Sequence, residues 1–167
     1  MNNHLDNSEY KKNVYDILEN NEFNRLSNIK HHGCNRLDHS IRVSYWSYKI
    51  SKFFKLDSEK VSRAALLHDF FLEDNDQLEK KDRAKTMVKH PEYALENAKK
   101  YFDLSEMEED IILTHMFPIG KRVPKYFESW IVDIVDDVVS VYEKSYVTRK
   151  KVSAAAVFLF TLLINIK

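Results

Sequence analysis

Apolar residues recur every three to four positions along most of this chain, with polar residues between them, and this spacing is typical of amphipathic α-helices. Capping residues, prolines and polar breaks mark where the helices end. The pattern predicts about seven helices joined by short loops, without internal repeats or a flexible linker. We therefore expect an all-α, single-domain helical bundle over residues 1–167.

Several helix ends carry recognisable signals. Asp57 is a suitable N-cap, Pro91 stands where a first helical turn accepts proline, and Ser105 and Glu108 have the spacing of a capping box. Residues 73–83 (EDNDQLEKKDR) are mostly polar and should form an exposed loop. In chain order, the predicted helices cover residues 8–28, 36–54, 57–72, a weak segment at 82–88, 90–102, 105–116, 124–143 and a terminal helix at 148–167.

The last of these segments is hydrophobic on every face (residues 151–167, KVSAAAVFLFTLLINIK). A membrane span needs about 20 consecutive apolar residues, and this segment is shorter, so we expect no membrane span. We expect residues 148–167 to form a core helix of the bundle instead. Contact with a membrane surface or with a second copy of the chain is the alternative.

Composition limits the class of protein further. Two glycines and three prolines are too few for the turns of a β-sandwich or barrel. Lys plus Arg equals Asp plus Glu at 26 each. The chain therefore lacks the basic excess typical of nucleic-acid-binding proteins, and we expect no nucleic acid partner. One cysteine, Cys34, cannot form an internal disulfide, and the N-terminus lacks the pattern of a signal peptide. We expect a cytoplasmic protein, whose oligomeric state the sequence does not indicate.

The second predicted helix carries a histidine that should face the core. On a helical wheel His39 shares one stripe with Val43, Trp46, Ile50 and Phe53. A single inward histidine is more often a hydrogen-bonded core residue than a ligand. His39 alone therefore indicates no chemistry.

A second histidine and a carboxylate interrupt the apolar run AALLHDFFL (residues 64–72). His68 lies in line with Val61, Ala65 and Leu72 on the helical wheel, so it should also face inward. Burying the Asp69 carboxylate costs several kcal/mol unless a partner neutralises it. An arginine, a lysine or a metal ion would serve.

The apolar helix at 124–143 adds three aspartates. Asp133 is expected to face water, whereas the helical wheel does not separate Asp136 from Asp137. Two inward histidines on separate helices, an adjacent aspartate and a later aspartate supply mixed nitrogen and oxygen ligands. Such a set suits a divalent ion, and an ion would explain the buried carboxylate.

The same residues resemble the signature of the HD-domain phosphohydrolases. The first histidine lies in RLDHSIRVSYWSYKI, the His-Asp doublet in SRAALLHDFF and the distal aspartate in SWIVDIVDD. The resemblance covers residues 31–143 and implies a helical bundle in which His39, His68, Asp69 and a distal aspartate bind metal. It favours Asp136 for the distal position, although Asp137 follows where many relatives have a basic residue.

A subset of that family has extra histidines that support a second metal, which makes His90 and His115 candidate ligands. His31 and His32 line the pocket or merely belong to a turn. The expected cofactor is therefore one or two divalent ions, and this donor set does not distinguish Fe, Mn, Mg, Zn, Co and Ni.

The chemistry of such a site suits a phosphate ester. One ion lowers the pKa of bound water, and a second can hold phosphoryl oxygens. His68 and Asp69 are the candidate catalytic residues, because Asp69 can also guide the proton of the water. Candidate contacts to the substrate phosphate are Arg36, Lys121 and Arg122. The expected substrate is a nucleotide or another small phosphorylated molecule, and the rival hypothesis is a non-catalytic helical HD-like binding or regulatory module that retains a structural metal.

Overall fold

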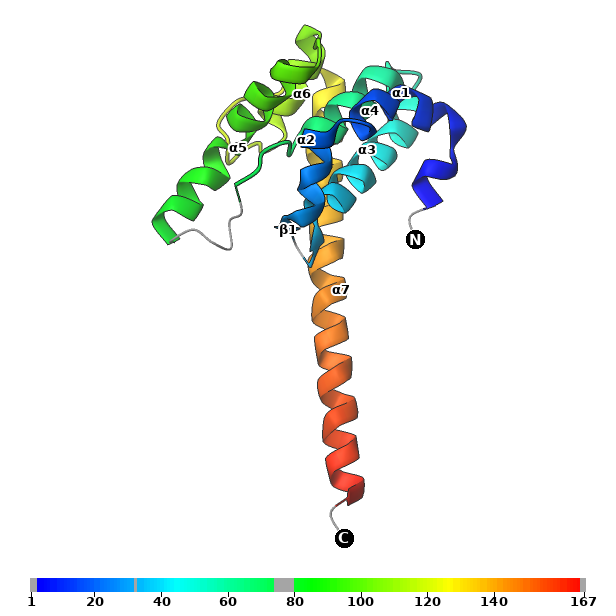
Figure 1. The fold of residues 1–167 in the computed structure, drawn as a ribbon, viewed down its shortest axis with the longest axis vertical. Helices are drawn as coiled ribbons and strands as arrows, with labels where there is room; N and C mark the ends of the chain where they lie inside the picture. Colours follow the sequence, from blue (N-terminus) through cyan, green and yellow to red (C-terminus); the bar gives the residue numbers. More distant parts are fainter. Residues whose placement is uncertain (1–2, 32, 74–79, 166–167) are drawn as a thin grey trace.

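The computed structural model describes residues 3–31, 33–73 and 80–165 and confirms the predicted all-α fold (Figure 1). Among the described residues, the only strands are β1 (Lys30–His31) and β2 (Cys34–Asn35), which pair antiparallel. The helices are η1 (Asn3–Asp6), α1 (Ser8–Leu18), α2 (Asn21–Asn24), η2 (Arg25–Asn28), α3 (Arg36–Phe53), α4 (Ser58–Leu67), α5 (Lys80–Tyr101), α6 (Glu106–Thr114) and α7 (Phe127–Asn165). No helix of the described residues is long and apolar enough to cross a membrane.

Two of the predicted helix starts are built as the sequence indicates. The Asp57 carboxylate accepts the backbone N–H of Lys60 at 3.1 Å and begins α4. In α6 the Glu108 carboxylate accepts the backbone N–H of Ser105 at 2.8 Å, as in a capping box. Both caps satisfy N–H groups that have no partner inside the helix.

The first predicted helix is wrong as a single element. It is divided into α1, α2 and η2. The division follows from Asn20, whose side chain accepts the backbone N–H groups of Glu22 and Phe23 at 3.0 Å each and so begins a new helix.

The helix predicted from residue 90 starts ten residues earlier in the structure. α5 runs from Lys80 to Tyr101 and includes the weak segment at 82–88. Pro91 therefore lies inside a helix and not in its first turn. Residues 80–83 of the predicted loop are helical, and residues 74–79 lie outside the described residues.

The terminal helix does not begin at Thr148, because α7 is one helix of 39 residues from Phe127 to Asn165. The segment between 143 and 151 contains neither proline nor glycine, so nothing interrupts the helix there. Figure 1 shows the backbone of the C-terminal half of α7 extending away from the other helices. The side chains beyond residue 150 lie outside the described set, and a core role for residues 148–167 stays a prediction.

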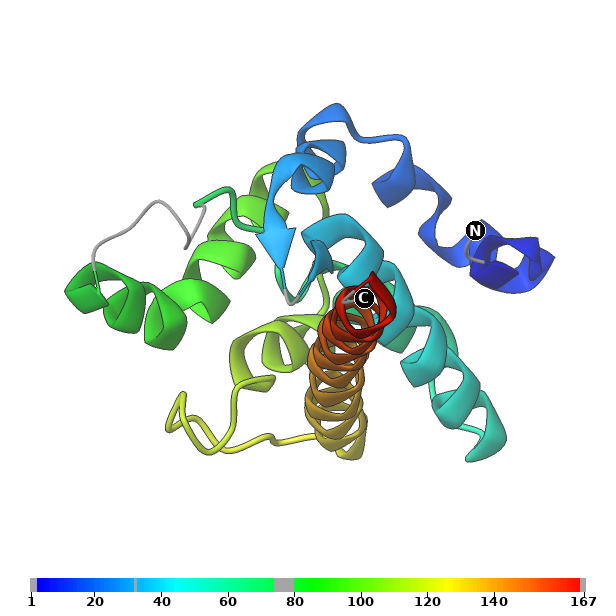
Figure 2. The same ribbon diagram turned by 90° about the horizontal axis from the view of Figure 1, so that it is seen from below.

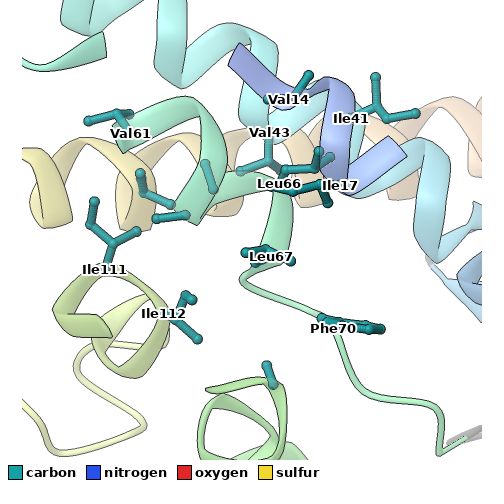
Figure 3. Close-up of a cluster of buried hydrophobic side chains, with 14 of the residues drawn as sticks. Val14, Ile17, Ile41, Val43, Val61, Leu66, Leu67, Phe70, Ile111 and Ile112 are labelled. Carbon is teal, nitrogen blue, oxygen red and sulfur yellow. The ribbon is translucent and has the colours of Figure 1, made fainter. Parts of the chain in front are cut away.

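The remaining helices pack around one apolar core (Figure 3). α3 contacts α4 and α7, α4 contacts α1 and α6, and Figure 2 shows α3 and α6 on either side of α7. Fully buried residues from the different layers include Val14, Ile17, Val43, Leu66, Leu67, Ile111 and Ile112. The predicted stripe of α3 is only partly inside this core, because Trp46 and Phe53 are 48% and 80% exposed.

Candidate metal centre

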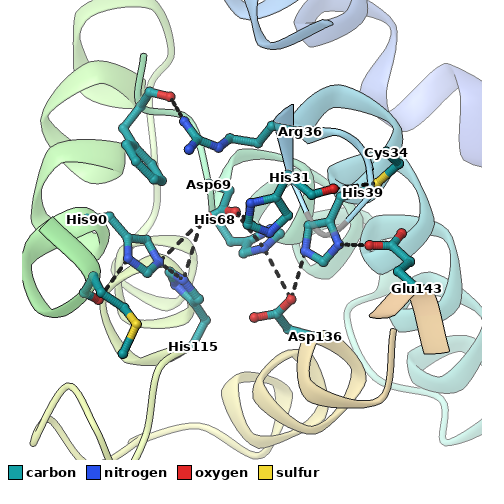
Figure 4. A network of polar contacts seen from close by, with 12 residues as sticks. His31, Cys34, Arg36, His39, His68, Asp69, His90, His115, Asp136 and Glu143 are labelled. Carbon is teal, nitrogen blue, oxygen red and sulfur yellow. Dashed lines mark hydrogen bonds and ion pairs between the residues drawn. The ribbon is translucent and has the colours of Figure 1, made fainter. Parts of the chain in front are cut away.

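Buried histidines and aspartates from five segments meet inside the bundle (Figure 4). His39 lies in the first turns of α3, His68 and Asp69 directly follow α4, and His115 directly follows α6. The other two predicted ligands are His90 of α5 and Asp136 of α7. Each of these six residues is less than 9% exposed, so bulk water cannot solvate the charges of the two carboxylates.

The inner half of the cluster is built around Asp136. One carboxylate oxygen, Oδ1, lies 2.9 Å from His39 Nε2 and 3.6 Å from His68 Nε2. These ligand atoms of His39, His68 and Asp136 lie within 4.8 Å of one another. Asp137, the alternative distal aspartate, is exposed on the same helix.

The two carboxylate oxygens of Asp69 face two different groups of histidines. Oδ1 lies 3.2 Å from His90 Nε2 and 3.8 Å from His115 Nε2. Oδ2 lies 3.6 Å from His31 Nε2 and 3.9 Å from His68 Nε2. The carboxylate is therefore placed between two clusters of nitrogen donors.

Three of the histidines are oriented by the same local device. In each case the Nδ1–H group donates to the backbone carbonyl three residues earlier. His68 donates to Ala65 at 2.8 Å, His90 to Met87 at 2.9 Å and His115 to Ile112 at 2.8 Å. Since a carbonyl can only accept, each ring carries a proton on Nδ1. In the neutral form of the ring, Nε2 then presents a lone pair to the cluster.

These carbonyls are available because the helix leaves them without a partner. Ala65 and Ile112 lie in the last turns of α4 and α6, where carbonyls have no hydrogen-bond partner within the helix. Met87 lies inside α5, but the residue four positions ahead is Pro91, which has no N–H. The proline therefore frees the carbonyl that fixes the orientation of His90.

Two contacts in the cluster would be stabilised by a cation. His90 Nε2 and His115 Nε2 lie 2.8 Å apart, although both rings carry their proton on Nδ1. Two lone pairs approach this closely only when a proton or another cation lies with them. In addition, His68 Nε2 is fully buried and has no hydrogen-bond partner. A buried nitrogen without a hydrogen bond, beside two carboxylates, is suited to coordinate a metal ion.

The charges of the cluster agree with this interpretation. Burial would raise the pKa of Asp69 and Asp136, but the neighbouring imidazoles hold the pKa of both carboxyls well below the usual range. Burial would lower the pKa of His39, and hydrogen bonds to Asp136 and Glu143 raise it to about 10. The field that attracts protons to His39 would attract a divalent cation equally.

His115 lies in the opposite situation. Burial, followed by the nearby His68 and His90, lowers the pKa of His115 to about 3. Its imidazole is therefore neutral at physiological pH. A neutral imidazole is the form that binds metal.

The sequence did not point to Glu143, which supports His39 from behind. Its Oε2 accepts the Nδ1–H of His39 at 3.0 Å, and its Oε1 pairs with Arg42. Glu143 is 5% exposed and lies seven residues after Asp136, so both carboxylates are on one face of α7. That spacing was the available signal. Partners behind a ligating histidine fix its tautomer and raise its basicity.

The other predicted site residues lie in varied surroundings. His31 is close to the cluster, whereas His32 lies outside the described residues. Arg36 is fully buried, and its guanidinium donates to the carbonyls of Phe71 and Glu73 and stacks over the Phe71 ring at 3.6 Å. Lys121 and Arg122 are exposed in the loop between α6 and α7.

The expectation that Asp133 faces water is wrong. Asp133 is 5% exposed because the loop after His115 covers it, and its Oδ1 accepts the backbone N–H of Phe117 at 3.0 Å. Burial, followed by the charge of Asp137, raises the pKa of Asp133 to about 7. A helical wheel considers one helix alone and cannot show that a loop from another part of the sequence covers it.

The all-α fold and the buried His/Asp cluster define the class as a helical protein with a candidate metal-binding site. The model of the HD domain family matches residues 36–140, so the chain belongs to the HD domain family. This result confirms the resemblance found in the sequence. Members of the family generally bind divalent metals and act as hydrolases. Comparisons with curated proteins and with solved structures gave no match.

Proposed function

We propose that this protein is a metal-dependent phosphohydrolase that acts on a small phosphate ester, with a nucleotide as the expected substrate. The observation that carries the proposal is the set of imidazole Nε2 atoms that meet beside two carboxylates, with His68 Nε2 lacking any hydrogen bond. Such an arrangement is unfavourable without a cation.

The distances favour two groups of ligands. We assign His39, His68 and Asp136 to one ion and His90 and His115 to a second ion. Asp69 would serve both, because Oδ1 faces His90 and His115 while Oδ2 faces His68. His31, 3.6 Å from Asp69 Oδ2, lies at the edge of the first group.

When bound, divalent ions in such a centre lower the pKa of water and offset the charge that develops on a phosphoryl group. Asp69 is the carboxylate best placed to accept the proton of the attacking water, because it lies between both ligand groups. His39 and His68 hold their orientation through their Nδ1 hydrogen bonds.

Substrate charge would be met by exposed bases. We propose Lys121 and Arg122 for this role, since both lie in the loop that follows His115; Arg122 now pairs with Glu92 at 2.9 Å. Arg36 is engaged with backbone carbonyls, so in our proposal it holds the segment at 70–73 against the site and is not a phosphate contact.

The test measures metal content and turnover together. Protein purified without chelator should contain a divalent metal, and it should release phosphate or a nucleotide product from a panel of nucleotides with added Mn²⁺, Mg²⁺ or Fe²⁺. His68→Ala and Asp69→Ala should lose both bound metal and turnover. His4→Ala is the matched control, because His4 stacks on Tyr45 and lies outside the cluster.

The outcomes separate the two hypotheses made from the sequence. Turnover by His68→Ala or Asp69→Ala at the normal rate would show that these residues do not carry out catalysis. Bound metal that depends on His68, combined with no turnover on any phosphate ester in the panel, would instead support the non-catalytic module.

A further inference from the structure

An apolar groove lies between α3 and α7. It has a volume of about 660 Å³, and its lining is mainly hydrophobic. Trp46 and Ile50 line it from α3, and Ile134, Val138 and Tyr142 line it from α7. Ile134, Val138 and Tyr142 are 58%, 63% and 63% exposed, so no part of the described chain covers them.

Further apolar side chains are exposed near the ends of the same two helices. Phe53 and Phe54 at the end of α3 are 80% and 55% exposed, and Phe127 at the start of α7 is 58% exposed. The rings of Phe54 and Phe127 lie 6.2 Å apart. Exposed apolar side chains gathered on two neighbouring helices are typical of a surface that binds a partner.

A second apolar segment is the C-terminal part of α7. In the sequence, residues 152–166 contain no charged residue, and the helix carries them away from the rest of the chain (Figure 1).

We propose that the groove between α3 and α7 binds the C-terminal part of α7 from a second copy of this chain, in a two-fold symmetric antiparallel pair. The groove is centred near Val138 and the apolar segment near Phe158. On one straight helix these positions are about 30 Å apart. A two-fold axis near Thr148 brings each C-terminal segment onto the groove of the other copy.

The order of residues along α7 suits this arrangement. Apolar positions at 134–142 and 152–165 are separated by the polar segment EKSYVTRKK (residues 143–151), so the helix is self-complementary about its middle. A continuous helix cannot return to the groove of its own chain. The second copy would also cover Trp46, the exposed residue of the predicted α3 stripe that lines the groove.

The first experiment measures mass in solution by light scattering. We expect the wild-type chain to have twice the mass of one 19.9 kDa chain and Val138→Lys to have the mass of one chain. Val138 is 63% exposed in the single chain, so lysine there should not disturb the bundle. Val123→Lys is the matched control, because Val123 is 61% exposed in the loop before α7 and should leave the dimer intact.

A second experiment tests the arrangement itself. In a Cys34→Ser background, copies carrying Val138→Cys are mixed with copies carrying Phe158→Cys and oxidised. We expect a disulfide-linked pair with the mass of two chains. A wild-type monomer would overturn the proposal, as would a dimer that Val138→Lys leaves unchanged. A monomer that sediments with phospholipid vesicles would also overturn it.

Discussion

Glu143 offers a sharp test of how the candidate centre is supported, because it touches a proposed ligand without being one. Its carboxylate accepts the Nδ1–H of His39 at 3.0 Å and pairs with Arg42 through the other oxygen. The opposite nitrogen, His39 Nε2, faces Asp136 at 2.9 Å. Glu143→Ala therefore removes one of the two contacts that orient the imidazole.

The expected loss follows from this geometry. Removing the partner behind a ligating histidine lowers metal affinity by about 10- to 100-fold. That loss corresponds to about 1.4 to 2.7 kcal/mol of binding free energy. Glu143→Gln keeps an oxygen that can accept the Nδ1–H of His39, so we expect a loss below about tenfold. Arg42 is 24% exposed and can turn towards water in both variants.

The assay is a calorimetric titration of metal-stripped protein with Mn²⁺. Asp137→Ala is the control, because Asp137 is an exposed carboxylate on the same helix. The predicted order of affinity is wild type and Asp137→Ala first, then Glu143→Gln, then Glu143→Ala. Wild-type affinity in Glu143→Ala, or an equal loss in Asp137→Ala, would refute the role of Glu143.

Three further predictions follow from the site and its surroundings. Asp136→Asn should abolish high-affinity metal binding in the same titration, and retained affinity would exclude Asp136 as a ligand. Asp133 has a pKa raised to about 7, so the folded protein keeps a proton that the unfolded chain loses above about pH 4, and stability falls as pH rises towards 7. With allowance for solvent screening, Asp133→Asn should gain on the order of 1–2 kcal/mol over wild type in urea unfolding at pH 8, and less at pH 5; a pH-independent difference would contradict this. Arg36→Leu should lower the free energy of unfolding by about 3 kcal/mol, since the carbonyls of Phe71 and Glu73 lose a charged donor; a change under about 0.5 kcal/mol would show that this contact is not structural.

Local patterns in the sequence predict the fold and three members of the cluster, whereas Asp136, His90 and His115 are chosen from the resemblance to the HD-domain family. Helical periodicity places His39 and His68 inward, and Asp69 stands out as a carboxylate in an apolar run. The structure places these three residues in one buried cluster. Agreement at this level reflects the fact that an amphipathic helix has one face that must be buried.

What the sequence misses depends on contacts between distant segments. Glu143 supports His39 across 104 positions, and Asp133 is buried by the loop at Phe117. Pro91 is accepted inside α5 because the carbonyl it frees binds His90. The predicted burial of Trp46 is wrong, because a helical wheel shows which residues are apolar but not whether another segment covers them.

The most direct test of the central claim is an anomalous scattering map from crystals of protein purified without chelator. We predict a peak about 2.0–2.3 Å from His68 Nε2, His39 Nε2 and a carboxylate oxygen of Asp136. A map without any peak beside His68, from protein that is active on a phosphate ester, would contradict the account.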